Sequence, residues 1–513
     1  MNYAISIDCG TQSLRTLLFD ENGQLHDMEK ITYTPYFSKM PGWAEQHVDV
    51  YWNALCKSVK NLKERNKEKF RKVLGVSITT QRDTVVFLDK DGNPLRPAII
   101  WLDQRKAPPK NPLNFFENIA FSIIRMKETA LRIYRKSRPN WVREMEPEIW
   151  GKISKILLLS SYFLYKLTGK FIDSKASQIG HIPFDYKRQS WPKSDKHWRW
   201  RLFGFRRDFL PELVEPCTAV GKITKKVANE TGLPEGIDII TSGSDKGCET
   251  LGTGCINTDC ASLSFGTTAT IQVTSQKYFE PISFIPPYPA VVPNSYNPEI
   301  EIFRGYWLVK WFIKEFGEKE IKLAEKLNVA PEIVLNGFLD NIPPGSHGLV
   351  LHPMWTPGLD MPNAKGAIIG FGDVHTKGHV YRAIIEGINY ALRDGMERIE
   401  KKGKIKIKKL TVSGGGAQSN RICQITANMF NLPVYKPLTH ETSGLGAAIC
   451  VFAAYSDIKT VVKNMVHYSK VFYPQKEEVE IYEKLYKKVY KKIYSSLKNI
   501  YEDIKKITNY PED

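Results

Sequence analysis

One short motif occurs twice, about half the chain length apart, and it restricts the folds open to this sequence. The first copy, Asp8–Ser13 (DCGTQS), lies between the apolar runs 3–7 and 14–19. The second copy, Leu263–Thr268 (LSFGTT), has strand-forming residues on both sides in the same way. Each copy predicts a strand, a tight Gly-Thr turn and another strand. A repeat at half-length predicts two related domains and excludes a solenoid of short units.

The chain has 513 residues, which exceeds one ordinary hydrophobic core. We therefore predict two domains, residues 1–253 and 254–513. Segments with the strand and helix periods alternate in both halves, which predicts the α/β class. The predicted strands include 72–79, 84–88 and 410–413, and the predicted helices include 48–66, 155–167, 379–398, 419–430, 443–455 and 476–506.

The composition is that of a soluble globular protein, with 42% hydrophobic and 25% charged residues. The eight cysteines include no Cys-x-x-Cys pair, so we expect free thiols in a reducing compartment. The sequence has neither a basic leader with an apolar run nor an uncharged apolar stretch of roughly 18–20 residues. We therefore expect a cytoplasmic protein without a transmembrane segment.

The formal net charge is +18, which could attract nucleic acid or anionic lipid. No nucleic-acid motif accompanies the charge, so we expect a solvated lysine-rich surface and no nucleic-acid partner. Residues 108–138 are basic and amphipathic. This segment fits either a helix packed on the surface or a helix that binds a membrane surface or a partner.

Three segments contain residues suited to phosphate chemistry. In the first, Gly10 lets the backbone approach a phosphate, the Thr11 and Ser13 hydroxyls can bind it, and Asp8 suits a divalent ion. The second, Ser413–Asn420, has three glycines between a strand and a helix, where a ligand can touch the backbone. In the third, Gly243–Gly247, Asp245 could accept a proton from an attacking hydroxyl. A hairpin turn, a flexible loop and a turn aspartate are the structural alternatives.

A further group of residues combines polar side chains with tryptophan. Amides, carboxylates and guanidinium groups bond hydroxyls in directional pairs, and an indole face packs against sugar C–H groups. Each residue taken alone could equally serve the fold. The candidates for binding an acceptor are Trp43, Gln46, Arg82, Asp83, Trp101 and Asp103.

Together and in this order, the motifs resemble the FGGY carbohydrate kinases, the group that contains glycerol kinase and xylulokinase. The resemblance covers nearly the whole chain. The strongest matches are Gly366–Phe371 with His379–Val380 and Ala383–Glu386, Ser413–Asn420 with Gln424, and Glu441–Ala448.

The resemblance implies an actin/hexokinase-like fold, two ribonuclease-H-like domains with ATP and Mg²⁺ in the cleft between them. The implied activity is transfer of the γ-phosphate of ATP to a hydroxyl of a small sugar or polyol. Asp245 is similar to the catalytic base, and Asp8 and Asp245 are similar to the residues near magnesium. The implied nucleotide contacts are Gly10, Thr11, Gln12, Ser13, Gly266 and Thr267 for the phosphates, and Gly414, Gly415, Gly416 and Asn420 for adenosine.

The chain also departs from the family pattern. Arg138 stands three residues before Trp141, where the first family signature has lysine, and segment 108–138 matches neither glycerol kinase nor xylulokinase. The sequence therefore leaves open which sugar or polyol is the acceptor, and a homodimer is possible. Two other functions stay open, a catalytically weak sugar or nucleotide sensor on the same fold and a partner-coupled ATPase.

Overall fold

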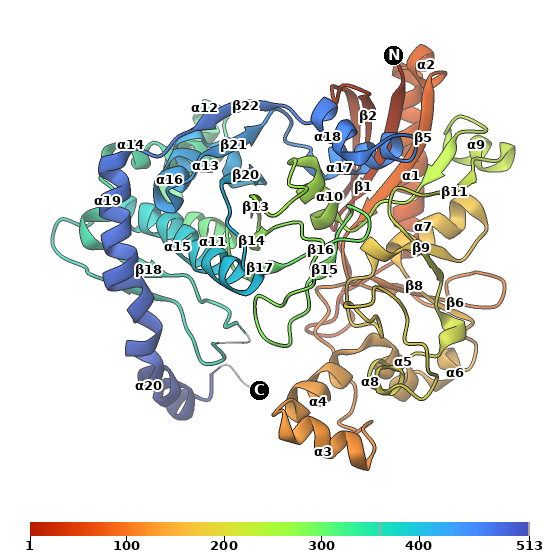
Figure 1. Ribbon diagram of the computed structural model, residues 1–513, viewed down its shortest axis with the longest axis horizontal. Coiled ribbons are helices and arrows are strands. Elements are labelled where there is room, and N and C mark those ends of the chain that lie inside the picture. Colours follow the sequence, from red (N-terminus) through yellow and green to blue (C-terminus); the bar gives the residue numbers. More distant parts are fainter. Residues whose placement is uncertain (359–360, 511–513) are drawn as a thin grey trace. The chain divides into compact units, whose positions relative to one another are not determined.

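Strand β1 (Tyr3–Cys9) is buried along its whole length, as expected for a strand covered on both faces of a sheet. In the computed structural model, which describes residues 1–358 and 361–510, it lies inside a six-stranded sheet (Figure 1). Strands β1 to β3 form an antiparallel meander, β5 and β12 continue the sheet in parallel to β1, and β11 is antiparallel. The order is β11 (Ala219–Lys222), β12 (Asp238–Ile240), β5 (Val73–Thr80), β1, β2 (Ser13–Asp20) and β3 (Leu25–Thr32).

A second six-stranded sheet repeats this pattern of directions in the later part of the chain. Its strands β13, β14 and β17 are antiparallel, β20 and β21 run parallel to β13, and β22 is antiparallel. The order is β17 (Glu299–Ile302), β14 (Ala269–Gln272), β13 (Cys260–Phe265), β20 (Lys409–Ser413), β21 (Val434–Pro437) and β22 (Tyr468–Phe472). Both Gly-Thr turns therefore join the first two strands of equivalent sheets, and the α/β class is confirmed.

The described chain divides into two units, each with its own hydrophobic core. Unit 1 contains Met1–Gly254, Tyr288–Tyr296 and Glu441–Val466. Unit 2 contains Cys255–Pro287, Asn297–His440 and His467–Asp513.

Helices cover the sheets in both units, and short strands outside the two six-stranded sheets lie between these elements in the sequence. None of the helices in the described residues combines the length and apolarity needed to cross a bilayer. The unit 1 helices are α1 (Val48–Arg65), α2 (Lys67–Phe70), α3 (Phe115–Ile123), α4 (Lys127–Lys136), α5 (Arg138–Met145), α6 (Pro147–Trp150), α7 (Leu159–Thr168), α8 (Trp198–Phe203), α9 (Lys225–Thr231), α10 (Asp245–Gly252), α17 (Thr442–Ala453) and α18 (Ile458–Met465). The unit 2 helices are α11 (Trp307–Phe316), α12 (Glu318–Leu327), α13 (Pro331–Asn336), α14 (Phe338–Asn341), α15 (Lys377–Gly403), α16 (Asn420–Phe430), α19 (Lys476–Leu485) and α20 (Lys491–Thr508). The smaller strands are β4 (Glu45–Gln46), β6 (Val85–Leu88), β7 (Ala98–Ile99), β8 (Lys155–Leu158), β9 (Ile172–Ser174), β10 (Glu212–Val214), β15 (Tyr288–Pro289), β16 (Tyr296–Asn297), β18 (Val350–His352) and β19 (Ala367–Ile369).

The predicted helix over 155–167 is wrong at its start. Residues Lys155–Leu158 form β8, which pairs with β6, and helix α7 begins only at Leu159. The apolar run Ile156–Leu158 fits both a buried strand and a helix turn, and pairing with β6 decides for the strand.

Two glycines let helices α10 and α17 approach backbone to backbone in unit 1. A Cβ on Gly446 would lie 1.9 Å from the Cys248 carbonyl oxygen, and a Cβ on Gly252 would lie equally close to the Thr442 carbonyl oxygen. This contact fixes the helix that begins at Asp245 against α17.

Candidate active site

The β1–β2 turn holds its shape by a backbone hydrogen bond from Gly10 N–H to the Ser13 carbonyl, 3.0 Å. Asp8 lies one residue before the end of β1 and is mostly buried. The Arg15 guanidinium approaches the Asp8 carboxylate to 3.6 Å and also reaches Glu441 at 3.6 Å. The turn therefore lies directly beside a buried carboxylate.

Burial raises the pKa of Asp8 to about 7. Arg15 opposes the shift, while the carboxylates of Asp245, Glu441 and Glu249 add to it. The Asp8 carboxylate thus shares its surroundings with other acidic groups, and a cation at this point would relieve their repulsion.

Asp245 is the first residue of α10, where the helix dipole favours a negative charge. Ser244 caps the helix by accepting a hydrogen bond from Gly247 N–H, and the Asp245 carboxylate accepts one from Lys246 N–H at 2.8 Å. Burial raises the pKa of Asp245, Arg82 and Lys246 oppose the shift, and Glu249 supports it. A buried carboxylate with a raised pKa suits a general base.

Arg82 follows β5 and lies beside Asp245. Its Nε is 3.4 Å from the Ser244 hydroxyl, and its guanidinium lies 4.8 Å above the centre of the Tyr288 ring. Tyr186 lies against Tyr288 in turn, with ring centres 5.9 Å apart. The structure thus brings the predicted base and one predicted acceptor-binding residue together.

Asp83 has a different set of partners, including a histidine that the sequence analysis missed. Its carboxylate accepts hydrogen bonds from His181 N–H at 2.9 Å and from the His181 ring at 2.8 Å, and Arg138 lies at 3.3 Å. Burial would raise the pKa of Asp83, but Arg138 and His181 outweigh it and hold that pKa below its usual range. A Cβ on Gly180 would lie 2.4 Å from the carboxylate. Asp83 therefore positions its neighbours and stays ionised.

The Nδ1 atom of His181 has two contacts: it lies 2.8 Å from the Asp83 carboxylate, which can only accept, and 3.1 Å from Arg138 Nη1, which can only donate. Both contacts hold the imidazole ring through Nδ1. The His181 side chain is partly exposed. A hydroxyl can both donate and accept, so it can hydrogen-bond to Nε2 in either tautomer. The only local signal in the sequence was the Gly180-His181 dipeptide after β9.

Trp101 is exposed, and hydrogen bonds link its indole to Thr11 in the β1–β2 turn and then to Gln81, the residue after β5. Its indole N–H donates to the Thr11 hydroxyl at 3.0 Å, and Thr11 donates to the Gln81 amide oxygen at 2.6 Å. The Thr11 side chain is therefore engaged by the fold.

Three further residues predicted to bind the acceptor have contacts within unit 1. They are Trp43, Gln46 and Asp103. Asp103 accepts from Ala44 N–H at 2.7 Å and forms a buried ion pair with Arg105, whose guanidinium lies 4.1 Å from the Trp43 ring centre. The Gln46 amide donates to the Thr34 carbonyl and accepts from His47 N–H. The polar groups of these side chains are thus engaged in hydrogen bonds and an ion pair within unit 1.

In unit 2 the Gly266 turn is also held by backbone hydrogen bonds. Tyr306 N–H donates to the Gly266 carbonyl at 3.0 Å and Trp307 N–H to the Thr267 carbonyl at 3.2 Å. Thr267 is exposed.

The three consecutive glycines differ in what the fold requires of them. Gly414 has a φ of +82°, and a Cβ there or on Gly416 would clash with Phe265 or Tyr306. A Cβ on Gly415 would meet nothing within 4 Å. The fold explains Gly414 and Gly416, whereas Gly415 faces open space. Asn420, which begins α16, is exposed and accepts from Lys436 at 3.1 Å.

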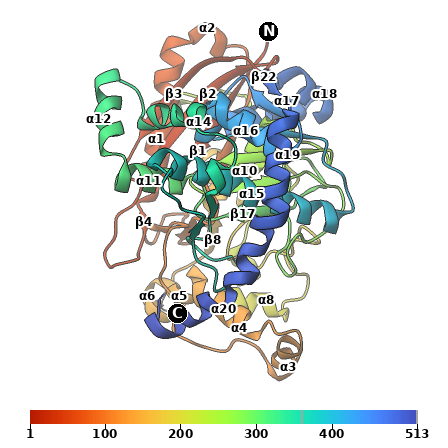
Figure 2. The same ribbon diagram turned by 90° about the vertical axis from the view of Figure 1, so that its left-hand side faces the viewer.

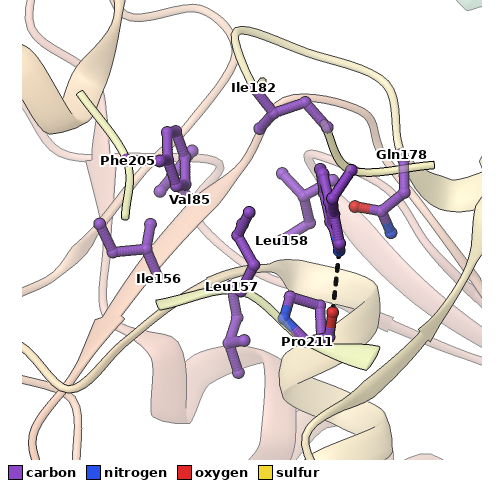
Figure 3. A pocket seen from close by; sticks show the side chains of 10 residues that line it. Val85, Ile156, Leu157, Leu158, Gln178, Ile182, Phe205 and Pro211 are labelled. Atoms are coloured by element: carbon purple, nitrogen blue, oxygen red, sulfur yellow. Dashed lines mark hydrogen bonds between the residues drawn. The ribbon is translucent and has the colours of Figure 1, made fainter. Parts of the chain in front are cut away.

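Figure 3 shows a small apolar cavity of about 10 Å³ inside unit 1, room for one water at most. Two residues of its lining are joined by a hydrogen bond, which the Trp191 indole N–H donates to the Pro211 carbonyl at 3.0 Å. None of the residues predicted to carry chemistry lines this cavity; its lining comprises Val85, Ile156, Leu157, Leu158, Gln178, Ile182, Trp191, Phe205, Leu210 and Pro211.

No group of three His, Cys, Asp or Glu side chains within 1–358 and 361–510 has an arrangement that could hold a metal ion by itself. Mg²⁺ in nucleotide enzymes usually takes one or two carboxylates and completes its shell with water and phosphate oxygens. The mutually repelling carboxylates of Asp8 and Asp245 fit that smaller requirement.

Comparison with known proteins yields two family models that match successive parts of the chain. Residues 3–252 match the "FGGY family of carbohydrate kinases, N-terminal domain", and residues 261–455 match the C-terminal domain of the same family.

Relatives align over nearly the full length. The xylulose kinase of Lactococcus lactis is 29% identical over 498 residues, which cover 94% of this chain and 95% of that protein. The crystal structure of xylulose kinase from Rhodospirillum rubrum superposes with a TM-score of 0.81 at 23% identity, covering 98% of this chain and all of the other. The structure of Plasmodium falciparum glycerol kinase with ADP gives a TM-score of 0.77 at 19% identity, covering 96% and 98%.

Proposed function

Because the chain belongs to the FGGY family of carbohydrate kinases, we propose that Asp245 is the general base of phosphoryl transfer to a sugar or polyol hydroxyl. The protein is an ATP-dependent carbohydrate kinase, a phosphotransferase with an alcohol acceptor. The acceptor oxygen attacks the γ-phosphorus of ATP, the bond to the β-phosphate oxygen breaks, and the hydroxyl proton passes to Asp245. The products are a sugar or polyol phosphate and ADP.

The observation that carries this assignment is the buried Asp245 carboxylate at the start of α10, with Arg82 beside it. Arg82 lowers the pKa of the base and offers donors to acceptor hydroxyls. We place His181 in the acceptor site as well, with Asp83 and Arg138 positioning its ring. Exposed Trp101 offers an indole face for sugar C–H groups.

For the nucleotide, we propose the backbone of Gly10, Thr11, Gln12 and Ser13 in unit 1 as a phosphate-binding turn. In unit 2 we propose Gly266 and Thr267 for phosphate, and Gly414–Gly416 with Asn420 for adenosine. Asp8 and Asp245 would hold Mg²⁺, directly or through water, and the ion would neutralise charge that develops on the phosphates.

The acceptor that we propose is a neutral polyol or ketose. The aligned relatives are named for xylulose and glycerol, and an imidazole beside an arginine offers hydrogen bonds to hydroxyl groups without requiring a charged substrate. No observation supports the sensor or the partner-coupled ATPase, since the relatives carry kinase names.

The test is ADP release from Mg·ATP by the purified protein across a panel of polyols, ketoses, aldoses and sugar acids. We expect a signal with one class of polyol or ketose, and we expect Asp245→Asn to lower kcat at least about 100-fold while ATP affinity changes less than a few-fold. Near-normal turnover by Asp245→Asn would refute the base. ADP release without any acceptor, and unchanged by all of them, would favour the ATPase.

A further inference from the structure

Helix α3 (Phe115–Ile123) presents large apolar side chains to solvent. The structure buries none of its residues. Phe115, Phe116, Ile119 and Ile123 lie within about 100° of arc on the helix, because successive residues are separated by about 100°. Each of these four, and Ile124 at the C-cap, is between 45% and 79% exposed. In both views the helix lies at the outer edge of unit 1 (Figures 1 and 2).

The opposite side of α3 is fixed to unit 1, so the helix cannot easily turn its apolar face inward. Asn114 and Glu117 form a capping box at the first turn, with both hydrogen bonds at 2.9 Å. Arg201 donates to both Glu117 oxygens at 2.6 Å, and Phe121 packs against Trp198 with ring centres 5.2 Å apart. Glu117 and Phe121 therefore lie on the side of the helix that contacts the rest of unit 1. The four exposed apolar side chains lie on the solvent side.

The same segment is strongly basic. Residues 106–136 contain seven lysines and arginines and two glutamates, and one of the glutamates is paired with Arg201. Five of the basic residues are exposed: Lys106, Lys110, Arg125, Arg132 and Lys136. Exposed phenylalanine and isoleucine beside several cations are the two features that bind a protein to an anionic lipid surface.

We propose that α3 and its basic surroundings, residues 106–136, dock the protein reversibly on an anionic membrane surface. The phenylalanine and isoleucine side chains insert at the level of the lipid headgroups, and the lysines and arginines lie against the anionic phosphates. The helix is nine residues long, so it lies on the bilayer and does not cross it.

A second copy of the chain fits this surface less well. Docking two copies through residues 106–136 would bring two net-positive segments together, in a molecule of net charge +18. The five apolar side chains are also few beside the roughly 20–30 residues per side of a stable interface. An anionic bilayer attracts the positive charge of residues 106–136, and it can take up a small number of apolar side chains.

The experiment is flotation of the full-length protein with phosphatidylcholine vesicles, with and without about 30 mol% phosphatidylserine. We expect binding to the anionic vesicles and at least about 10-fold weaker partition to the neutral ones. The double variant Phe115→Ser/Phe116→Ser should lose at least about 10-fold in partition. Ile507→Ser, an equally exposed apolar residue on α20, is the matched control and should bind like the wild type. ADP release by both variants with the acceptor, or thermal unfolding if no acceptor is found, verifies that they fold.

Three outcomes would overturn the proposal. The first is absence of binding, or equal binding to neutral and anionic vesicles. The second is a loss of binding in Ile507→Ser and none in the double variant, which would place the contact on α20. The third is self-association of the wild type that the double variant abolishes, without vesicle binding, which would make α3 an interface between copies.

Discussion

At the scale of single residues, the charges around Asp245 set the pH range over which it can act as a base. Lys246 donates to Glu249 at 2.6 Å; Lys246 lowers the pKa of Asp245 and Glu249 raises it. A base must be deprotonated, so activity falls as pH drops through its pKa. Lys246→Met should therefore move the acid limb of kcat/KM for the acceptor to higher pH, and Glu249→Gln should move it to lower pH. Profiles from about pH 5 to 8 measure both. If the acid limbs of the two variants moved in the same direction, the assignment of Asp245 as the base would be contradicted.

His181 allows a second prediction at this scale. If its Nε2 forms a hydrogen bond with a hydroxyl of the acceptor, His181→Ala should raise the acceptor KM about 10-fold, the value of one buried hydrogen bond. The KM for ATP should stay within about 2-fold, because the residue has no proposed nucleotide contact. His440→Ala removes an exposed histidine elsewhere and serves as the control. Equal changes in both KM values would mean that His181 acts through the fold.

At the scale of elements, two glycines have opposite surroundings: Gly446 packs one helix against another, and Gly415 faces open space. Alanine usually stabilises a helix relative to glycine by about 1 kcal/mol. Gly446→Ala should nevertheless lower the free energy of unfolding by about 2–3 kcal/mol, because its Cβ meets the Cys248 carbonyl at 1.9 Å.

Gly415→Ala is the counterpart of that variant. A Cβ there meets nothing within 4 Å, so stability should stay within about 0.5 kcal/mol of the wild type. The KM for ATP should rise several-fold if adenosine lies against this backbone. Denaturant midpoints and ATP kinetics measured on both variants separate the two roles. Loss of stability in Gly415→Ala would assign the glycine to the fold.

The same elements explain what the sequence could predict. The Gly-Thr turns and the strand, glycine loop and helix around Gly414 are local patterns, and the structure has them where they were expected. The ring of partners around Asp83 joins residues 83, 138 and 181, and no local pattern relates those positions. For the same reason the packing of α17 on α10, far apart in sequence, could not be predicted.

At the scale of the whole molecule, the net charge of +18 acts on the two substrates unequally. Mg·ATP is an anion and the proposed acceptor is neutral, so only the nucleotide gains from the long-range field. Raising the salt from about 20 mM to about 200 mM shortens the screening length from roughly 20 Å to roughly 7 Å. We expect the Kd for Mg·ATP to rise about 3- to 10-fold over this range, and the acceptor KM at saturating ATP to change less than about 2-fold. An equal rise in the Kd for Mg·ATP and in the acceptor KM would mean that salt acts on the fold. No change in either constant would mean that the lysines are too dispersed to favour nucleotide binding.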